Sequence, residues 1–391
     1  MRLLGFPVDL WRITGADFIV RTTYQMGKTP LLPLYAAALG ASDLMIGQVV
    51  AISTLTGLLL KPLFGLLSDR SGRRVWLLVS LGLFAFTPFL YRFVETPEQL
   101  FALRLFHGTA TAIFGPVGLA YVAEMGTERR AERLGLFGMA RIGGSLLAPI
   151  IAALLLIRFP PEQVFTIIGF ASCLAFLPVI GMADKPMATR QHFGTDLAEA
   201  VRAVMASRAF RLVAALEMAV YIATYAIKAF LPIYALKAAG FDLLEVGVFF
   251  SAQELVHLLT RPFGGRLADR LGCEAPIMAG FLVLAASLMA LGHVESGFLL
   301  VMVAAGIGVG LGLILPATLS LFSTEMPAAN LGAGMGALGA LRNLGKVVGP
   351  VAAGVILAHA SYSMLFSLCA LFILATVSAF AAITLYRRRL A

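Results

Sequence analysis

Twelve stretches of about twenty mostly apolar residues follow one another along this 391-residue chain, and they constrain its fold more than any other feature. An α-helix rises 1.5 Å per residue, so about 20 apolar residues are needed to cross the hydrocarbon core of a membrane. Only 13% of the residues are charged, whereas a soluble domain is about 25% charged, which argues against a soluble enzyme. The predicted membrane-spanning helices are 11–38, 43–67, 75–94, 98–125, 131–157, 162–182, 209–238, 243–268, 275–293, 297–324, 330–358 and 361–386.

Most connections between these spans are short, and the one long connection divides the chain. Residues 183–208 carry several charges together with apolar residues at helical spacing, which predicts a linker with a short surface helix. We therefore expect an all-α membrane protein. Its two six-helix bundles, 1–182 and 209–391, are joined by a cytoplasmic linker at 183–208.

The distribution of charge predicts the orientation in the membrane. The chain holds 30 Lys and Arg against 21 Asp and Glu, a balance found in nucleic-acid-binding proteins and in membrane proteins. Eighteen of the basic residues fall in segments on the side of the termini, and three (Arg92, Arg158 and Lys237) fall on the other side. Because cytoplasmic loops carry the excess of Lys and Arg, we expect cytoplasmic termini and no nucleic-acid partner. The compact loops, with no glycosylation sequon at either asparagine, favour a bacterial inner membrane.

The two halves of the chain are related in sequence. LPLY at 32–35 matches LPIY at 231–234, and KPLFGLLSDRSGRR at 61–74 matches RPFGGRLADRLGCE at 261–274. Matches at a steady offset of about 200 residues indicate a parallel duplication, which is one signature of secondary transporters.

The segment GLLSDRSGRR at 65–74, between the second and third spans, resembles the loop signature of the major facilitator superfamily. A degenerate copy, GRLADRLGCE, lies at 265–274, and the resemblance extends over the whole chain. It implies two pseudo-symmetric bundles and a loop that latches the halves in one state of the transport cycle. The alternative is a turn whose charges only set the topology. The implied gating residues are Gly65, Asp69, Arg70, Gly72, Arg73, Arg74, Gly265, Asp269, Arg270 and Gly272.

The residue types of this loop have physical reasons. Gly65 permits close packing of helix backbones, and Gly72 permits a tight turn. Asp69 is an acceptor at a helix end, able to cap N–H groups or to pair with an arginine.

The fourth span contains RLFHGTATA from Arg104 onward, which is similar to the family's intramembrane Arg-plus-Gly motif, with His107 where a glutamine is more usual. An arginine within the membrane costs about 2.5 kcal/mol or more, so Arg104 needs a partner. One interpretation is that the charge of Arg104 acts on a proton-carrying or solute-binding group. The other is an arginine satisfied by backbone carbonyls of the first span.

Glycines and prolines recur at matching positions of the fifth and eleventh spans. The pattern resembles the family's antiporter motif, in which small residues let helices approach closely and the proline kinks the chain. Alanines replace several glycines in the fifth span, so the better copy lies in the eleventh. The predicted helix-packing residues are Gly135, Gly144, Pro149, Gly336, Gly345, Gly349 and Pro350.

Polar residues on one face of several spans indicate a water-accessible interior, since charged residues within a membrane face the bundle interior or a cavity. The predicted transport-path and coupling residues are Asp17, Arg21, Tyr24, Gln25, Lys28, Arg104, His107, Glu217, Tyr221, Tyr225 and Lys228. The predicted residues at the seam between the halves are Arg141, Glu254, His257, Arg261, Arg342, Asn343 and Lys346. Helical spacing predicts that Asp17 pairs with Arg21. The family arrangement implies that Glu254 faces Arg141, either as a coupling pair or as a static one.

The function indicated is secondary active transport of a small solute by alternating access, and we favour proton-coupled efflux. No ATP-binding motif or reactive constellation is present, so we expect neither an enzyme nor a cofactor. The three dispersed cysteines predict neither a disulfide framework nor a metal site. Uptake or export of an anionic solute or a metal chelate stays open, as does a non-transporting receptor or assembly protein with this fold. We expect a monomer whose partners are a solute, protons and the lipid bilayer.

Overall fold

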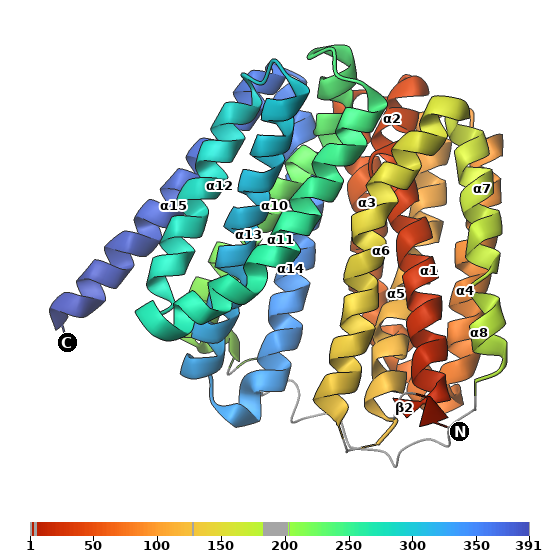
Figure 1. The fold of residues 1–391 in the computed structure, drawn as a ribbon, viewed down its shortest axis with the longest axis horizontal. Helices are drawn as coiled ribbons and strands as arrows, with labels where there is room; N and C mark the ends of the chain where they lie inside the picture. The colour runs from red at the N-terminus through yellow and green to blue at the C-terminus, as the bar shows by residue number, and fades with distance from the viewer. Residues whose placement is uncertain (1, 4–5, 127–128, 183–201, 203, 391) are drawn as a thin grey trace. The chain divides into compact units, whose positions relative to one another are not determined.

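The computed structural model describes residues 2–3, 6–126, 129–182, 202 and 204–390, and this part of the chain is almost entirely helical (Figure 1). Most of the predicted linker at 183–208 lies outside the described residues. Two very short strands, β1 (Arg2–Leu3) and β2 (Phe6–Pro7), form an antiparallel pair that the all-α prediction missed.

The helices follow the predicted spans closely, and two predicted spans are each divided into two helices. The first span becomes α1 and α2, separated at Thr29 and Pro30, and the sixth becomes α7 and α8. Residues 1–189 contain α1 (Val8–Lys28), α2 (Leu31–Ala38), α3 (Asp43–Ser71), α4 (Arg73–Leu90), the short 3₁₀ helix η1 (Tyr91–Phe93), α5 (Pro97–Ala123), α6 (Arg130–Arg158), α7 (Pro161–Cys173) and α8 (Phe176–Ile180). Residues 190–391 contain α10 (Arg208–Lys237), α11 (Leu243–Leu271), α12 (Glu274–Leu291), α13 (Gly297–Glu325), α14 (Ala328–Leu357) and α15 (Tyr362–Leu390).

Local sequence explains where several helices begin and end. Thr96 and Gln99 form a capping box at the start of α5, and Asp242 and Glu245 form one at the start of α11. Gly72 has a φ of 95°, in the left-handed region that glycine adopts without steric cost, which ends α3 and lets α4 start at the next residue.

The chain divides into two compact units, residues 1–189 and 190–391, and the same helix pairs pack in both. In the first unit α1 packs against α6, α3 against α5, and α4 against α5 and α7. In the second unit α10 packs against α14, α11 against α13, and α12 against α13 and α15. The packing within the units therefore repeats the relationship found in the sequence.

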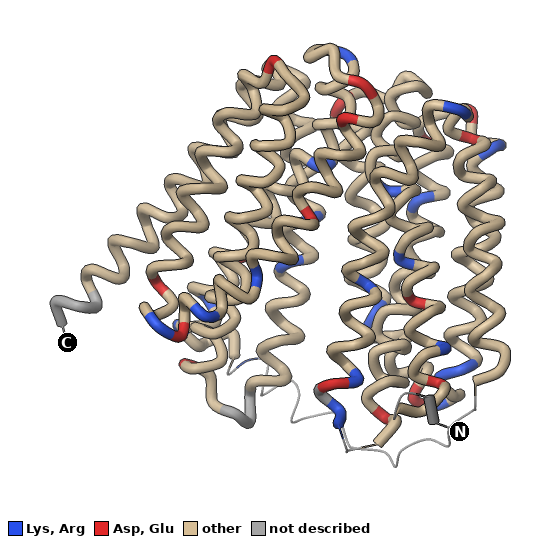
Figure 2. Tube along the Cα trace, viewed as in Figure 1, with Lys and Arg blue, Asp and Glu red and all other residues tan. Residues whose placement is uncertain are grey.

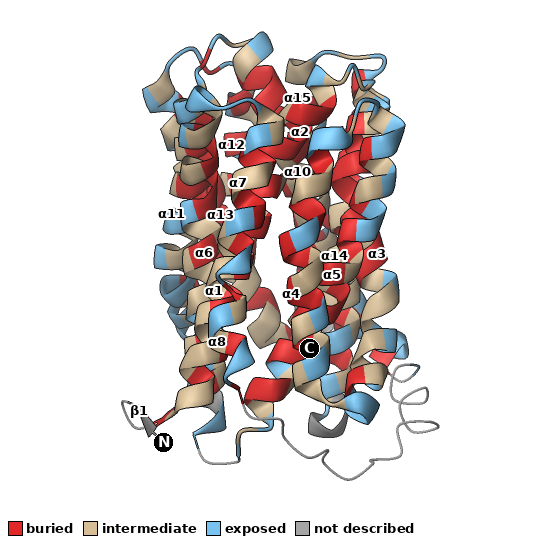
Figure 3. Ribbon diagram, turned by 90° about the vertical axis from the view of Figure 1, so that its right-hand side faces the viewer, coloured by how far each residue is buried: buried red, intermediate tan, exposed pale blue. Residues whose placement is uncertain are grey.

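Eleven helical segments of the described chain are long and apolar enough to cross a membrane. The helix α1 is not among them, because its 21 residues include five charged ones. Buried residues occur along the lengths of the long helices and not only near their ends (Figure 3).

Candidate functional site

The first helix of the N-terminal unit carries a buried carboxylate that binds an arginine of α6. The Asp17 side chain is only 2% exposed and accepts hydrogen bonds from Arg141 Nη2 at 2.7 Å and from Nε at 3.2 Å. A pair of N–H···O bonds to one carboxylate combines charge with fixed geometry. Helical spacing did not identify Arg141 as a partner of Asp17, because the packing of α1 against α6 brings this residue to the carboxylate from 124 positions away.

The second unit repeats this contact. The Glu217 side chain on α10 is 1% exposed and accepts hydrogen bonds from Arg342 Nε and, at 2.9 Å, from Arg342 Nη2 on α14. Thr318 Oγ1 donates a third bond at 2.9 Å. The two acids are 200 residues apart and the two arginines 201, so the acid–arginine pairs occupy corresponding places in the duplicated halves. The sequence singled out all four residues but not their pairing.

A lysine and a glutamate form the next contact along the polar face of α10. Lys228 Nζ lies 2.9 Å from Glu254 Oε1 on α11, and His257 Nδ1 lies 3.8 Å from the other carboxylate oxygen. Within the units, Arg141 binds Asp17 and Glu254 binds Lys228, and the expected contact between Glu254 and Arg141 stays a prediction.

The corresponding place in the first unit lacks the acid. Lys28 Nζ lies 3.3 Å from Thr54 Oγ1, and these two residues are each 200 positions before Lys228 and Glu254. The duplicated site therefore holds an ion pair in one unit and a hydrogen bond to a neutral hydroxyl in the other.

Aromatic rings line the cationic face of the second unit. Lys346 Nζ lies 4.8 Å from the ring centre of Tyr221 and 5.5 Å from that of Tyr225, and Lys228 Nζ lies 5.4 Å from Tyr225. These are cation–π distances, which stabilise ammonium groups in a site of low polarity.

Arg104 is 1% exposed and lies among hydroxyl groups. It donates to Ser53 Oγ at 2.6 Å and to the hydroxyls of Tyr91 at 3.3 Å and Tyr24 at 3.4 Å. His107 Nδ1 lies 3.1 Å from the Tyr91 hydroxyl. The alternative of backbone carbonyl partners is therefore wrong, since hydroxyls from α1, α3 and η1 take their place. No carboxylate of the described chain pairs with Arg104, and its Nε has no hydrogen-bond partner there.

The glycines of the repeated motif divide into two kinds. A Cβ added at Gly144 would lie 2.8 Å from Thr22 Oγ1, and one at Gly345 would lie 2.9 Å from the carbonyl oxygen of Met218. Glycine at these positions therefore permits the close approach of α6 to α1 and of α14 to α10, and Gly349 has the same close contact with α10. A Cβ at Gly135 or Gly336 would meet no atom within 4 Å, so close packing does not explain these two glycines. Pro149 and Pro350 lie inside α6 and α14.

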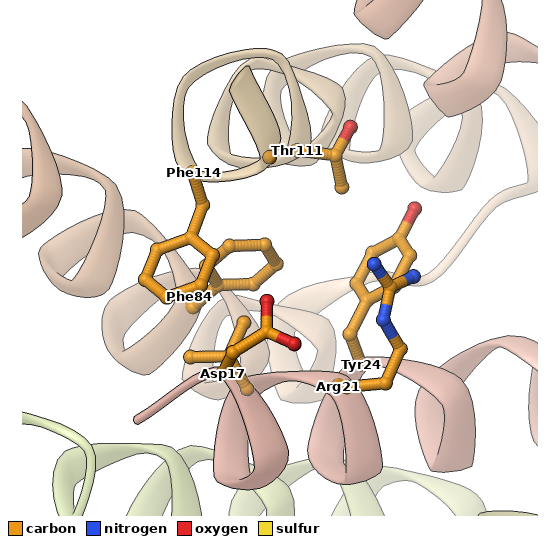
Figure 4. Close-up of a pocket in the computed structure, with 8 residues that line it drawn as sticks. Asp17, Arg21, Tyr24, Phe84, Thr111 and Phe114 are labelled. Carbon is orange, nitrogen blue, oxygen red and sulfur yellow. The ribbon is translucent and has the colours of Figure 1, made fainter. Parts of the chain in front are cut away.

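A pocket in the first unit opens between α1, α4 and α5. In Figure 4 the rings of Phe84 and Phe114 lie on one side, Arg21 and Tyr24 lie on the other, and the Asp17 carboxylate lies between them. Val20, Thr111 and Gly115 complete the lining. The pocket thus combines an aromatic wall with charged and hydroxyl groups.

The sequence model of the Major Facilitator Superfamily matches residues 18–256 and 213–390. The chain belongs to the major facilitator superfamily. Members of this family are transporters, so the chain is a multi-pass membrane transport protein and not an enzyme.

Individual relatives agree with this membership. The chain is 28% identical to the uncharacterized MFS-type transporter YuxJ of Bacillus subtilis, over 90% of this chain and 92% of the relative. It is 26% identical to a multi-drug resistance efflux pump PmrA homolog of Lactococcus lactis, over 88% and 87%. It is 25% identical to the multidrug resistance protein MdtG of Salmonella typhimurium, over 92% and 89%.

Solved structures share the fold. The nucleoside transporter NupG superposes with a TM-score of 0.81 at 14% identity, covering 96% of this chain and 99% of that chain. A bacterial homolog to the human lysosomal transporter Spinster superposes with a TM-score of 0.72 at 15% identity, covering 95% and 93%. At these identities the likeness establishes the major facilitator fold alone.

The first signature loop of this family member forms a network of charges. Arg73 pairs with Asp69 and, at 2.7 Å, with Glu124 at the end of α5, and it also donates to Ser68 Oγ at 2.6 Å. Arg74 donates to the carbonyl oxygen of Ile180 on α8 at 2.6 Å. The loop therefore joins the ends of α3, α4, α5 and α8.

The second signature loop lacks this network. Cys273 and Thr324 stand where the first half has Arg73 and Glu124, and Asp269 and Arg270 are exposed without hydrogen bonds to described side chains. Gly272 keeps the turn, with a φ of 84°. The packing predicted for Gly65 is wrong, because a Cβ added at Gly65 or at Gly265 would meet no atom within 4 Å.

Charged residues occur within the helices of both units as well as at the helix ends (Figure 2). Gln25 and Asn343 are half-buried and Arg261 and Arg70 are exposed, and none of the four makes a side-chain hydrogen bond to the described residues. Sequence reasoning missed several polar partners: Ser53, Thr54, Tyr91, Thr318 and Glu124. The offset of 200 residues would have found Thr54, because it aligns with Glu254.

Proposed function

We propose that this transporter has twelve spans in two pseudo-symmetric six-helix bundles, 1–182 and 209–391, joined by the linker at 183–208. The eleven apolar segments support this count, and α1 with α2 supplies the twelfth span. The charged residues Asp17 and Lys28 of α1 would be tolerated within the membrane because they bind partners on neighbouring helices. The bias of Lys and Arg supports cytoplasmic termini, and the bacterial sources of these relatives favour the cytoplasmic membrane of a bacterium.

We further propose that the chain exports a small solute in exchange for protons, by alternating access. The observation that carries this proposal is the pair of buried acid–arginine contacts at corresponding places in the two units. A carboxylate held by one arginine within a membrane is a group that can release its partner and take up a proton. The candidate proton carriers are Asp17, Glu217 and Glu254. The multi-drug resistance efflux pump homolog among the relatives supports the outward direction.

The gating role of the first signature loop also belongs to this proposal. Asp69 is 48% exposed and is held by Arg73, so its carboxylate is accessible for a second contact during the cycle. The seam role of Arg141, Glu254, His257, Arg261, Arg342, Asn343 and Lys346 stays a prediction, as does the monomeric state.

The proposal is tested with purified protein in liposomes. An imposed proton gradient should drive solutes from a broad panel against their own gradient. Three variants test the candidate carriers: Asp17→Asn, Glu217→Gln and Glu254→Gln. The variant that removes the proton-carrying carboxylate should abolish this uphill movement. Arg158→Gln is the control, because Arg158 is exposed at the end of α6. Undiminished uphill transport in all three acid variants would exclude these carriers.

A further inference from the structure

Lys228, Glu254 and His257 form a cluster inside the helices of the second unit. Lys228 Nζ on α10 lies 2.9 Å from Glu254 Oε1 on α11, and His257 Nδ1 lies 3.8 Å from Glu254 Oε2. The ammonium and the imidazole therefore approach different oxygens of one carboxylate. The three side chains are 18%, 22% and 20% exposed, so water reaches the cluster only in part.

The corresponding place in the first unit keeps the lysine and lacks the other two groups. The residues 200 positions earlier are Lys28, Thr54 and Gly57. A hydroxyl therefore stands where the second unit has a carboxylate, and a glycine stands where it has an imidazole. Glu254 and His257 thus occur together in one unit and are both replaced in the other, which indicates that they act as a set.

Within the second unit α11 packs against α10, α12 and α13, and few ionisable groups surround His257. The helices α12 and α13 carry such groups only at their ends, Glu274 and Glu325. A Cβ added at Gly308 of α13 would lie 2.9 Å from the backbone nitrogen of His257, so α13 lies directly against this turn of α11. The other ionisable groups, on α10 and on the adjoining turns of α11, are Lys228, Tyr225, Glu254 and Arg261. In the described part of this unit, Glu254 is therefore the acid that a protonated His257 would face.

The geometry of the cluster favours one place for a proton. A proton on Glu254 would remove the countercharge of Lys228, and charged groups within a membrane are normally paired. A proton on His257 would keep that ion pair and would bring a second positive charge to the other carboxylate oxygen. In water an imidazole also takes up a proton about two pH units above a carboxylate, and a nearby negative charge favours its protonated form. The imidazole is therefore the better site.

The second ring nitrogen gives protonation a conformational consequence. His257 Nε2 is buried and has no hydrogen-bond partner among the described residues. A protonated ring donates from both nitrogens, and a buried donor without an acceptor is costly. Proton uptake therefore favours an arrangement in which Nε2 reaches an acceptor such as water. A proton that shifts the balance between two arrangements is what coupling to alternating access requires.

We propose that His257 binds the proton at this cluster, while Glu254 stays ionised between Lys228 and His257. The ring takes the proton from water and later returns it to water, so the charge of the cluster changes by one at the imidazole alone. Glu254 acts as a positioning residue that holds both cations. The inference rests on the proposed exchange of solute for protons, since it names the group that holds a proton in the second unit.

The first test measures proton binding to the full chain in lipid nanodiscs, without a gradient. The Cε1–H NMR signals of ¹³C-labelled histidines report the protonation of each ring, and His257→Gln identifies the signal of His257. This signal should titrate between pH 5 and 8, as imidazoles do. Glu254→Gln should weaken its proton affinity about tenfold or more, because an opposite charge at such a distance shifts a titration by about 1–3 pH units. The exposed His359 is the control, and its titration should be the same with and without Glu254.

No titration of His257 in this range, or the same midpoint in the unmodified chain and in Glu254→Gln, would overturn the proposal. A second test uses transport: His257→Gln should abolish uphill movement driven by a proton gradient and keep downhill movement, which also shows that the variant is folded. Undiminished uphill movement in His257→Gln would overturn the assignment and leave proton-coupled export standing. Titration of His257 as expected, in a chain that moves no solute, would support the proton site and contradict export.

Discussion

Removing Arg141 tests how much the contact between α1 and α6 contributes to stability. Arg141→Gln leaves the Asp17 carboxylate 2% exposed and without its two charged hydrogen bonds. Breaking a buried ion pair from one side costs about 3–5 kcal/mol, because an uncompensated charge stays buried. The arginine itself is 31% exposed, so solvent screens part of the contact, and we expect about 3 kcal/mol.

The assay is a double-mutant cycle on unfolding in detergent. Arg141→Gln should lower the Tm clearly, Asp17→Asn should lower it less, and the double variant should be more stable than Arg141→Gln alone, because no buried charge remains. The same order should hold for Glu217→Gln and Arg342→Gln, since the second unit repeats the contact. Additive effects, with negligible coupling between Asp17 and Arg141, would refute the reasoning.

Three further outcomes follow from the contacts described. Gly144→Ala should destabilise the protein by about 1–3 kcal/mol, since its Cβ would lie 2.8 Å from Thr22 Oγ1, whereas Gly135→Ala, where no atom lies within 4 Å, should be neutral or stabilising in thermal unfolding. Thr54→Glu should raise the Tm, because it places a carboxylate beside Lys28 as Glu254 lies beside Lys228; an unchanged or lower Tm would contradict this correspondence between the units. Asp69→Asn should lower the transport rate while changing stability by no more than about 1 kcal/mol, because the side chain is 48% exposed; an undiminished rate would remove its gating role.

The sequence predicted the helices well because membrane spans leave a strong local pattern. Apolar runs of fixed minimum length located α3 to α6 and α10 to α15 within a few residues. The break between α1 and α2 was missed, because the apolar character continues across Thr29 and Pro30 and conceals the change of helix.

The residues of the candidate site were found by a different argument, and their partners were not. A charge within a membrane is conspicuous in sequence, which identified Asp17, Glu217 and Arg104. Their partners depend on which helices pack and at what height, and local spacing carries no information about that. Helical spacing therefore suggested Arg21 as the partner of Asp17, whereas the packing of α1 against α6 brings Arg141 to that carboxylate. Neutral hydrogen-bond partners of Arg104, such as Ser53 and Tyr91, cannot be recognised from the pattern of apolar residues.

The most direct test of the account is proton movement driven by the solute itself. Liposomes containing the protein and a pH-sensitive dye are loaded with a permanently charged solute that the protein moves in the panel above, and are diluted with the membrane potential clamped. Outward movement of the solute should acidify the lumen, and protein-free liposomes should show no change. A lumen whose pH does not change while the solute leaves, or one that becomes alkaline, would contradict proton-coupled export.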